Sequence, residues 1–396
     1  MRAAKSQKKA EGNFVSEWFG HRLHPTIVTT PTSISDQQTE RCPFLSAAVG
    51  EAKSCIKPAK ARGVCTISST SNGLRQDWLV CPYRALNDDL VSHSVRQLFA
   101  LPKSSNPFIT AAVALKKAEV RDDIQARLSA GQQVFIYFDK KTSGELSIPG
   151  TDRSPEFSFD VTVVELRSQN GGTHIGRFGI LEIQTMDFHG SYGAAVRNLK
   201  DALRMHTSDF ADSVQENQWW LSDSVEGPNI ANVFKRTFYQ MMFKFQLGQH
   251  ETCAGCVLAI PQAVWDSWQR HLGAPEMSKE ADGTYRLRAP GRDLPPICPA
   301  WIYVFDLDAT ANITPSPVVL RRVIGTDAPA VSYWALDVAP KAALSNISAE
   351  FGFLAALSRR LKRFWPELAK TVKVDISDEA RGTENRRKQR KKKVSI

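Results

Sequence analysis

One hairpin signal constrains this chain more than any other feature. Residues 157–166 and 175–184 are rich in β-branched and aromatic side chains, and the turn sequence Asn170-Gly171-Gly172 separates them. Apolar runs of this length predict strands, and Asn-Gly between two such runs is typical of a tight β-hairpin turn. The chain is therefore expected to contain an antiparallel pair of strands with a defined register.

That register brings three polar side chains to one face of the sheet. Pairing centred on Gly171 places Asp160 opposite Glu182, and Gln184 shares a strand face with Glu182 because the two are two residues apart. Facing carboxylates repel unless a cation lies between them, and Mg²⁺ is bound by such oxygens together with phosphate. We therefore predict a metal-dependent phosphodiesterase site, with Glu145 as a further candidate acid.

A simpler interpretation of these residues stays open. Alternating strands normally carry charged side chains on their solvated face, which would explain Asp160 and Glu182 without a function. Glu145 is equally well explained as an exposed carboxylate at the end of a strand. Against this, the strand around Glu182 is apolar enough to be central, and a central carboxylate needs a partner.

Four of the seven cysteines fall within one short stretch of the sequence. They are Cys42, Cys55, Cys65 and Cys81. An odd total does not suit a disulfide framework, whereas four clustered thiolates suit a structural tetrahedral metal site with zinc as the default ion. The usual Cys-x₂-Cys spacing is missing. Four unrelated cysteines, some of them buried as small apolar residues, therefore remain the alternative.

The charge of the chain favours a polyanionic partner, nucleic acid first. There are 51 basic and 41 acidic residues, so the net charge is +10. Much of the excess lies in residues 1–12, with four basic residues and one acidic, and in residues 371–396, with nine and four. We expect both ends to be disordered basic tails. The N-terminus has no apolar signal region and no run is long enough to span a membrane, so we expect a cytoplasmic protein.

Periodicity predicts an α/β protein with a mixed sheet. Helices are expected at 111–128, 191–205, 229–247 with Asn229 as cap, and 350–364. Further strands are expected at 133–138, 256–260 and 301–307, with an excursion rich in proline and glycine at 274–297. We divide the chain between its tails into a cysteine-containing region, 13–100, and a core, 101–370.

Several longer segments carry a resemblance to a known family. They are NFVSEWFGHRLHP, CPFL, RGVC, DWLVCPYRAL, GELSI, SPEFSFD, GILEIQTMDFHGSY, EGPNIANVFKRTFYQMMFKF and CAGCVLAIPQAVWDSWQRHL. In these segments, which run from about residue 13 to 365, the chain resembles the NotI-type family of type II restriction endonucleases, in the PD-(D/E)xK superfamily.

The resemblance implies a fold and two kinds of metal site. The fold would be a PD-(D/E)xK core, a mixed sheet flanked by helices, with an N-terminal four-cysteine subdomain. Asp160 and Glu182 match the residues that bind catalytic Mg²⁺ in that superfamily. Gln184 stands at the third position, where most members have lysine. The four clustered cysteines match an iron site, which shifts the expected metal from zinc to iron.

The resemblance also implies a substrate and partners. The substrate would be double-stranded DNA with a long palindrome of G and C only, such as GCGGCCGC, cut to leave 5′ overhangs. A palindrome implies a homodimer, and a bacterial restriction enzyme requires a cognate DNA methyltransferase. Candidate DNA contacts are Arg177, Asp187, His189, Tyr192, Lys235, Arg236 and Tyr239. Contact with phosphate, or a solvated face, is the alternative for each of them.

Two other functions are compatible with parts of this pattern. One is a sequence-specific DNA-binding regulator with a metal-stabilised subdomain and no catalysis. The other is a less specific PD-(D/E)xK repair nuclease. A regulator has no need of both Asp160 and Glu182, so the pair favours catalysis.

Overall fold

The computed structural model of the chain describes residues 12–71, 74–85, 88–140, 143–169, 171–308, 313–345, 357 and 359–367. Nearly all of both predicted tails, most of the predicted 350–364 helix and Asn170 of the predicted turn lie outside the described residues. The chain divides into two compact units, Met1–Tyr333 and Trp334–Ile396. In the part that is described, no helix is long and apolar enough to cross a membrane.

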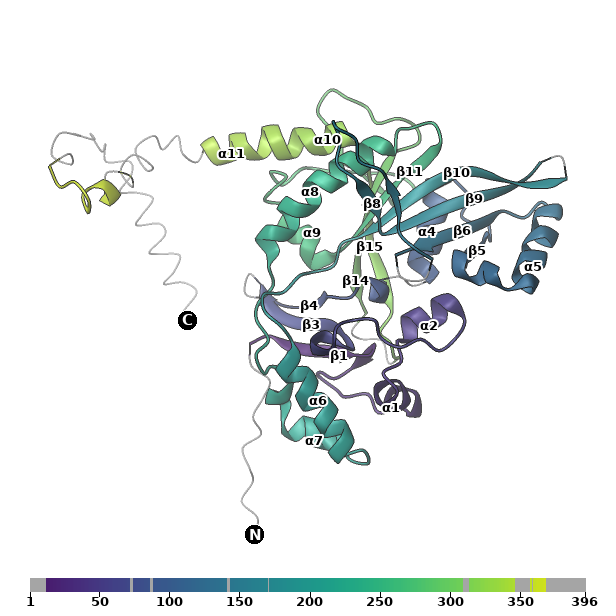
Figure 1. Cartoon of the computed structure of the whole chain (residues 1–396). Helices are drawn as coiled ribbons and strands as arrows, with labels where there is room; N and C mark the ends of the chain where they lie inside the picture. Colours follow the sequence, from purple (N-terminus) through teal and green to yellow (C-terminus); the bar gives the residue numbers. More distant parts are fainter. Residues whose placement is uncertain are drawn as a thin grey trace, which may run out of the picture. The chain divides into compact units, whose positions relative to one another are not determined.

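The first unit is built on a nine-stranded mixed sheet (Figure 1). Its strands are β5 (Phe108–Ala111), β6 (Val134–Asp139), β9 (Val161–Gln169), β10 (Gly172–Ile183), β11 (Cys253–Pro261), β12 (Ser278–Lys279), β13 (Tyr285–Arg286), β14 (Ala300–Leu307) and β15 (Val318–Thr326). They lie in the order β12-β13-β15-β14-β11-β10-β9-β6-β5. The expected mixed α/β class is confirmed.

Parallel strands form the centre of this sheet. β10, β11 and β14 run parallel, while β9 and β15 pair with them in the antiparallel sense on either side. β11 is buried along its whole length, as expected for a strand covered on both faces. The predicted excursion at 274–297 contributes β12 and β13, which extend the sheet at one edge.

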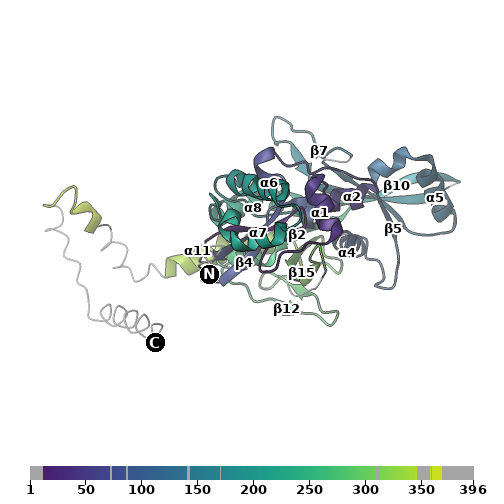
Figure 2. The same ribbon diagram turned by 90° about the horizontal axis from the view of Figure 1, so that it is seen from below.

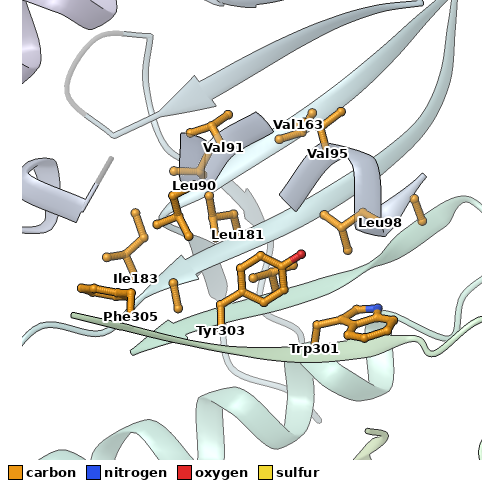
Figure 3. Packing of buried hydrophobic residues seen from close by; sticks show 14 of the residues in the cluster. Leu90, Val91, Val95, Leu98, Val163, Leu181, Ile183, Trp301, Tyr303 and Phe305 are labelled. Atoms are coloured by element: carbon orange, nitrogen blue, oxygen red, sulfur yellow. The ribbon is translucent and has the colours of Figure 1, made fainter. Parts of the chain in front are cut away.

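Helices cover both faces of the sheet. They are α4 (Asp88–Leu98), α5 (Ala118–Ser129), α8 (Ile230–Leu247), α9 (Gln262–Trp268) and α10 (Ala328–Tyr333). In Figure 3, α4 sets an apolar stripe that includes Val91 and Val95 against Leu181, Ile183 and Tyr303 of the sheet. Burying such side chains is worth roughly 1.5–3 kcal/mol each. Glu182 alternates with Leu181 and Ile183, so it faces the other side, where α8 lies.

A second, four-stranded antiparallel sheet is formed largely by the N-terminal region. Its strands are β1 (Phe14–Trp18), β2 (His21–Arg22), β3 (Val64–Ser71) and β4 (Leu74–Leu79), in the order β2-β1-β3-β4. Short helices α1 (Pro31–Gln38), α2 (Pro43–Val49) and α3 (Pro82–Ala85) surround it. α6 (Gly193–Met205) and α7 (Phe210–Glu216) pack their apolar residues into the core of this sheet. The core of this sheet and the core on the α4 side of the nine-stranded sheet therefore interleave along the sequence.

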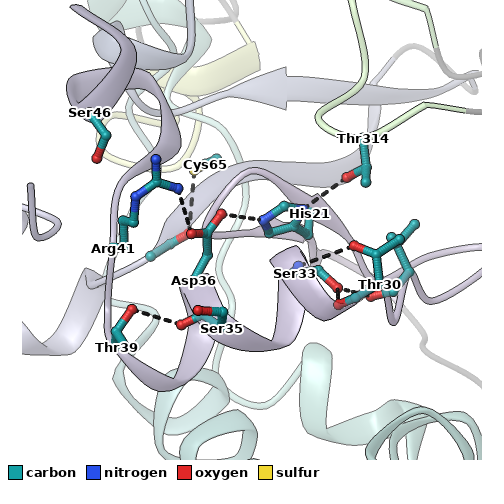
Figure 4. A network of polar contacts seen from close by, with 12 residues as sticks. His21, Thr30, Ser33, Ser35, Asp36, Thr39, Arg41, Ser46, Cys65 and Thr314 are labelled. Atoms are coloured by element: carbon teal, nitrogen blue, oxygen red, sulfur yellow. Dashed lines mark hydrogen bonds and ion pairs between the residues drawn. The ribbon is translucent and has the colours of Figure 1, made fainter. Parts of the chain in front are cut away.

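A buried polar network ties this sheet to the β14–β15 connection (Figure 4). His21 lies with Nε2 2.9 Å from Asp36 Oδ2 and Nδ1 2.9 Å from Thr314 Oγ1. The other Asp36 oxygen, Oδ1, accepts a bond of 2.7 Å from Arg41. Because Asp36 and His21 are almost fully buried, these bonds satisfy polar groups that would otherwise destabilise the fold.

Several predicted boundaries are corrected. The predicted helix at 111–128 begins only at Ala118, because β5, a 3₁₀ turn (Ala112–Lys116) and an extended Lys117 precede it. The predicted strand at 157–166 breaks at Asp160 into β8 (Phe157–Phe159) and β9, and β8 pairs with β7 (Leu146–Ile148) instead. Asn229 precedes α8, but its side chain makes no capping bond.

The remaining described elements are short. The first unit also has the 3₁₀ turns Ala59–Ala61 and Gln218–Leu221. Both views place α5 beside the outer half of the β9–β10 hairpin (Figures 1 and 2). The second unit begins with a π-helical turn (Trp334–Val338) followed by α11 (Ala339–Ser345), and Lys341 pairs with Asp337 one turn away.

Candidate functional site

Asp160 and Glu182 are held together by backbone hydrogen bonds. Asp160 lies in the break between β8 and β9, and Glu182 lies near the end of β10. The backbone N–H of Asp160 donates to Glu182 Oε1 at 3.2 Å, and the N–H of Ile183 donates to Asp160 Oδ2 at 3.0 Å. Each carboxylate therefore has one oxygen fixed by the backbone of the other strand.

The register that makes these bonds follows from an irregularity in the hairpin. Next to the turn Gly172 pairs with Gln169, and the pairing shifts by one residue between Ile175 and Phe178. From there Leu181 pairs with Val161, so the next residues along are Glu182 and Asp160. The predicted register is confirmed in this half of the hairpin. Between the turn and the irregularity at Ile175–Phe178, the observed pairing differs from the predicted one by one residue.

The second oxygen of Glu182 contacts a buried lysine. Lys244 of α8 places Nζ 2.6 Å from Glu182 Oε2, and both side chains are almost fully buried. Burial, and then the charge of Asp160, raise the pKa of Glu182 to about 8, although the ammonium of Lys244 acts in the opposite direction. Asp160 Oδ1 has no hydrogen-bond partner among the residues that the structure describes.

Gln184 is held by the same helix. Thr237 Oγ1 donates to Gln184 Oε1 at 2.7 Å, and Gln184 Nε2 donates to the backbone carbonyl of Thr185 at 2.6 Å. Thr237 and Lys244 are seven residues apart, which is two helical turns, so they lie on one face of α8. Glu182, which meets Lys244, and Gln184, which meets Thr237, lie on one face of a strand. One helix face therefore fixes both side chains.

These residues border a cavity of about 550 Å³. Its walls come from β8 and the segment before it, the end of β10, and α8, and its lining includes Asp160, Glu182, Gln184 and Lys244. Glu145 lies near this cluster and forms an ion pair of 2.5 Å with Lys140. Hydrogen bonds from Lys140 and Ser158 lower the pKa of Glu145. Glu145 is not among the described residues that line the cavity.

Three of the predicted DNA-contact residues lie on the rim of this cavity. Asp187, which follows β10, forms an ion pair with Arg236 of α8, and Tyr239 lies one turn further along the helix. All three side chains are exposed, Tyr239 to 60%. A large exposed aromatic beside an arginine is available for contact with a ligand.

The other four predicted contacts are placed differently. Lys235 and His189 are exposed, and Tyr192 is half-buried against Phe188. Arg177 lies over the ring of Phe99, 5.7 Å from its centre. Because Phe99 belongs to the core on the α4 side, Arg177 lies on the opposite sheet face from Glu182.

The four clustered cysteines come from segments that meet beside the N-terminal sheet. Cys42 precedes α2, Cys65 lies in β3 and Cys81 precedes α3; these three are buried, and Cys55 is half-buried. The thiols of Cys65 and Cys81 are hydrogen-bonded to each other, and Cys42 interacts electrostatically with Cys81 and Cys55. Pairwise interactions thus connect the four thiols.

The pKa values of these thiols shift in both directions: burial raises the pKa of Cys42, and the hydrogen bond with Cys81 together with burial raises that of Cys65. The backbone N–H of Gly63 donates to Cys55 Sγ at 3.3 Å. The hydrogen bond from Cys65, and then Lys57 and nearby backbone N–H groups, lower the pKa of Cys81, against the effect of burial. However, in the described part of the chain, no group of three or more His, Cys, Asp or Glu side chains is arranged so that it could hold a metal ion. The four-cysteine metal site therefore stays a prediction.

Sequence reasoning missed Lys244 and Thr237. Both occupy the apolar stripe of α8, which also contains Val233, Met241 and Phe245. A lysine at such a position is rare unless it is paired, so the helical pattern indicated that a carboxylate packs against this face of α8. Which carboxylate it is depends on how α8 packs on the sheet, which periodicity does not specify.

Comparison with known proteins adds no relative. No protein-family model matches the chain, and no curated protein matches it.

Proposed function

We propose that this chain is a Mg²⁺-dependent DNA endonuclease, a type II restriction enzyme of the NotI type with a PD-(D/E)xK core. The observation that carries the proposal is the pairing of Asp160 with Glu182 at the edge of a 550 Å³ cavity. The two carboxylates come from adjacent strands and are fixed by backbone hydrogen bonds before any ligand arrives. Such preorganisation is what a catalytic metal site requires.

The residues present fit a divalent cation. Each carboxylate uses one oxygen for a backbone N–H, which leaves Asp160 Oδ1 for a cation, while Glu182 Oε2 would bind the cation in place of its contact with Lys244. The pKa of Glu182 is raised in part by Asp160, so added positive charge beside the two would favour the ionised pair. Oxygen ligands from one or two carboxylates, completed by water and phosphate, are the set that Mg²⁺ prefers.

The chain's own residues would orient the reacting groups and form an apolar wall of the cavity. Bound Mg²⁺ would polarise the scissile phosphate and acidify a water. Gln184 is a neutral amide, so it neither takes up a proton nor supplies charge; fixed by Thr237, it can orient a water or a phosphate oxygen. Phe157, stacked on Phe243 at 3.5 Å, closes one wall of the cavity with apolar surface.

The rim of the cavity suits double-stranded DNA. Arg236 and Tyr239 are exposed beside the carboxylates, where a phosphate backbone would pass. We propose a GC-only palindrome as target, cut to 5′ overhangs by a homodimer with one site for each strand. A bacterial host would then need a cognate methyltransferase to protect its own DNA in the cytoplasm.

The clustered cysteines are proposed to hold one structural metal, iron with zinc as the alternative. Support comes from the donor set: three buried thiols, a fourth that is half-buried, and a pKa of Cys81 that its hydrogen bond with Cys65 and the charge of Lys57 lower. Such an ion would stabilise the loops around α2 and β3 and take no part in cleavage. Elemental analysis of the purified protein tests this, with one iron or zinc per chain expected and a metal-free, fully stable protein contradicting it.

The proposed activity is tested by incubating a GC-rich plasmid with the pure, folded protein. Discrete fragments are expected with Mg²⁺ and none with EDTA. A smear of random fragments would favour a less specific nuclease, and tight binding to one sequence without any cleavage would favour a regulator.

A further inference from the structure

We propose that Lys244 is a catalytic residue, whose ammonium binds a non-bridging oxygen of the scissile phosphate. This inference rests on the proposed nuclease function and extends it to a residue of α8. Lys244 lines the cavity, and its Nζ lies 2.6 Å from Glu182 Oε2. It therefore stands directly beside the carboxylates at which the phosphate would be cut.

The burial of Lys244 is unusual enough to need a reason. Its side chain is only 5% exposed, and its stem passes the ring of Phe159 with Nζ 5.6 Å from the ring centre. Removing an ammonium from water costs several kcal/mol, and a buried ion pair often repays no more than that cost. Two well-packed apolar side chains would serve stability as well. A charged pair at the wall of a cavity is better explained by a ligand that uses it.

The charge inventory of the cavity singles out this lysine. Among the described residues that line the cavity, the cations are Arg236 and Lys244. Arg236 lies at the exposed rim and is paired with Asp187, so it is placed to meet the DNA backbone from outside. Gln184, two residues beyond Glu182, is neutral. Lys244 is thus the described cation deep enough to reach a phosphate group held at Asp160 and Glu182.

The helix geometry explains how the ammonium of Lys244 on α8 can take the place of a lysine at position 184. Gln184 and Glu182 project from the same face of β10, and α8 crosses that face with Thr237 over the first and Lys244 over the second. An ammonium brought by the helix and one attached at residue 184 would approach the same carboxylate from neighbouring directions. This predicts that the charge can be moved from one position to the other.

The step is hydrolysis of a phosphodiester, and it balances without a further reactant. Water adds to phosphorus and gives up one proton to solvent, the bond from phosphorus to the 3′ oxygen breaks, and the leaving oxygen takes up a proton from solvent. Lys244 remains protonated throughout and donates hydrogen bonds to the phosphate oxygen on which negative charge increases. A preorganised donor of this kind accelerates a reaction by roughly 10²- to 10³-fold.

The first test compares Lys244→Met with the wild type. Methionine keeps much of the stem volume and removes the charge, so we expect the single-turnover cleavage rate to fall by about 10²- to 10³-fold. DNA affinity measured with Ca²⁺ should change by less than about tenfold, because most phosphate contacts lie elsewhere. The matched control is Lys279→Met, which removes the same charge from an exposed position on β12 and should cleave at the wild-type rate.

The second test moves the lysine. The double variant Gln184→Lys with Lys244→Met should recover at least tenfold of the lost rate, and Gln184→Lys alone should remain folded and bind DNA. Calorimetric titration with Ca²⁺ gives a readout besides activity: Lys244→Met should bind Ca²⁺ at least as tightly as the wild type, because the competing ammonium is gone. If Lys244→Met fails to fold, the conservative Lys244→Arg variant and the double variant carry the comparison.

Each outcome decides one question. Wild-type protein that folds and binds DNA but never cleaves it would overturn the proposed function. If the wild type cleaves and Lys244→Met cleaves within threefold of it, the proposed function stands and the role of Lys244 is wrong. A slow Lys244→Met that also loses Ca²⁺ binding, with no recovery in the double variant, would assign Lys244 a purely structural role and overturn the inference.

Discussion

Asp160 and Glu182 exchange hydrogen bonds through the backbone of adjacent strands, at 3.2 Å from the Asp160 N–H to Glu182 and at 3.0 Å from the Ile183 N–H to Asp160. The break between β8 and β9 makes this possible, because it frees the Asp160 side chain from a regular ladder. A flat, unbroken hairpin would direct both side chains outward without locking either of them. The irregularity of the strand is therefore what positions the pair.

Asp160→Asn should abolish cleavage while it preserves the fold. Asparagine still offers an oxygen to the Ile183 N–H, but it removes the negative charge that a divalent cation needs. We expect the cleavage rate to fall by at least about 10²-fold, with DNA binding in Ca²⁺ retained within tenfold. Single-turnover kinetics and gel-shift titration measure the two quantities. Loss of binding together with cleavage would mean that Asp160 reads DNA instead.

Thr237→Val should show whether the hydrogen bond from Thr237 orients Gln184 for cleavage. The substitution removes the 2.7 Å bond to Gln184 Oε1 and keeps the side-chain shape, so it should cost about 1 kcal/mol of unfolding free energy. The cleavage rate should also fall several-fold, because Gln184 loses its orientation. The control is Thr207→Val, which removes a 2.9 Å bond to the carbonyl of Leu203 away from the cavity. Equal effects of the two variants on cleavage would contradict the assignment.

The stability of the protein in EDTA should depend on the ionisation of Glu182. Burial and Asp160 raise its pKa from the ordinary 4.5 to about 8 in the folded chain, so the folded state binds a proton more tightly than the unfolded state. This contribution is fully present below pH 4.5 and is lost as the pH rises through 8. Wild type should therefore lose stability relative to Glu182→Gln as the pH rises from about 4.5 to about 8, as measured by urea unfolding. Parallel curves of stability against pH for the two proteins would argue against a raised pKa of Glu182.

The C-terminal residues should affect affinity and leave specificity unchanged. Residues 381–396 include most of the nine basic residues of the stretch 371–396, and such a charge run attracts phosphates without reading bases. Deleting them should weaken binding to non-specific DNA and reduce its dependence on salt, while the cut sequence stays the same. Filter binding across a salt series, followed by sequencing of the cut ends, measures both. A changed cut sequence would show that these residues contribute to recognition.

Cys65→Ser should destabilise the N-terminal sheet if the four cysteines hold a metal. Serine is nearly the same size, so the loss of a thiolate ligand would dominate the effect. We expect a lower melting temperature and loss of the metal, with cleavage by the remaining folded protein retained. Cys298→Ser, at another buried free cysteine outside the cluster, is the control. Equal melting temperatures for Cys65→Ser and wild type would argue against a structural metal.

The sequence predicted the elements of the catalytic face because their signals are local. Alternating residues defined β9 and β10, and the pairing near Leu181 follows the predicted register. Local signals also identified α6 and α8, whose observed ends lie within two residues of those expected. The break at Asp160 was not predicted, because it arises from the pairing of β8 with β7, a contact between segments that periodicity treats independently.

What the sequence did not reveal depends on packing between distant segments. Lys244 meets Glu182 across 62 positions of the chain, and Thr237 meets Gln184 across 53. Arg177 was placed near the carboxylates because it lies on the same strand, but its odd spacing of five residues from Glu182 puts it on the opposite face, over Phe99. The core of the N-terminal sheet was not predicted, because it is completed by α6 and α7 from later in the chain.

The most direct test of the central claim is to sequence the ends of DNA cut by the wild-type protein and by Asp160→Asn under the same conditions with Mg²⁺. The account predicts that every wild-type end falls within one palindrome of G and C with a 5′ overhang, and that Asp160→Asn yields no ends above background. Ends scattered over unrelated sequences, or the same ends from Asp160→Asn, would contradict it.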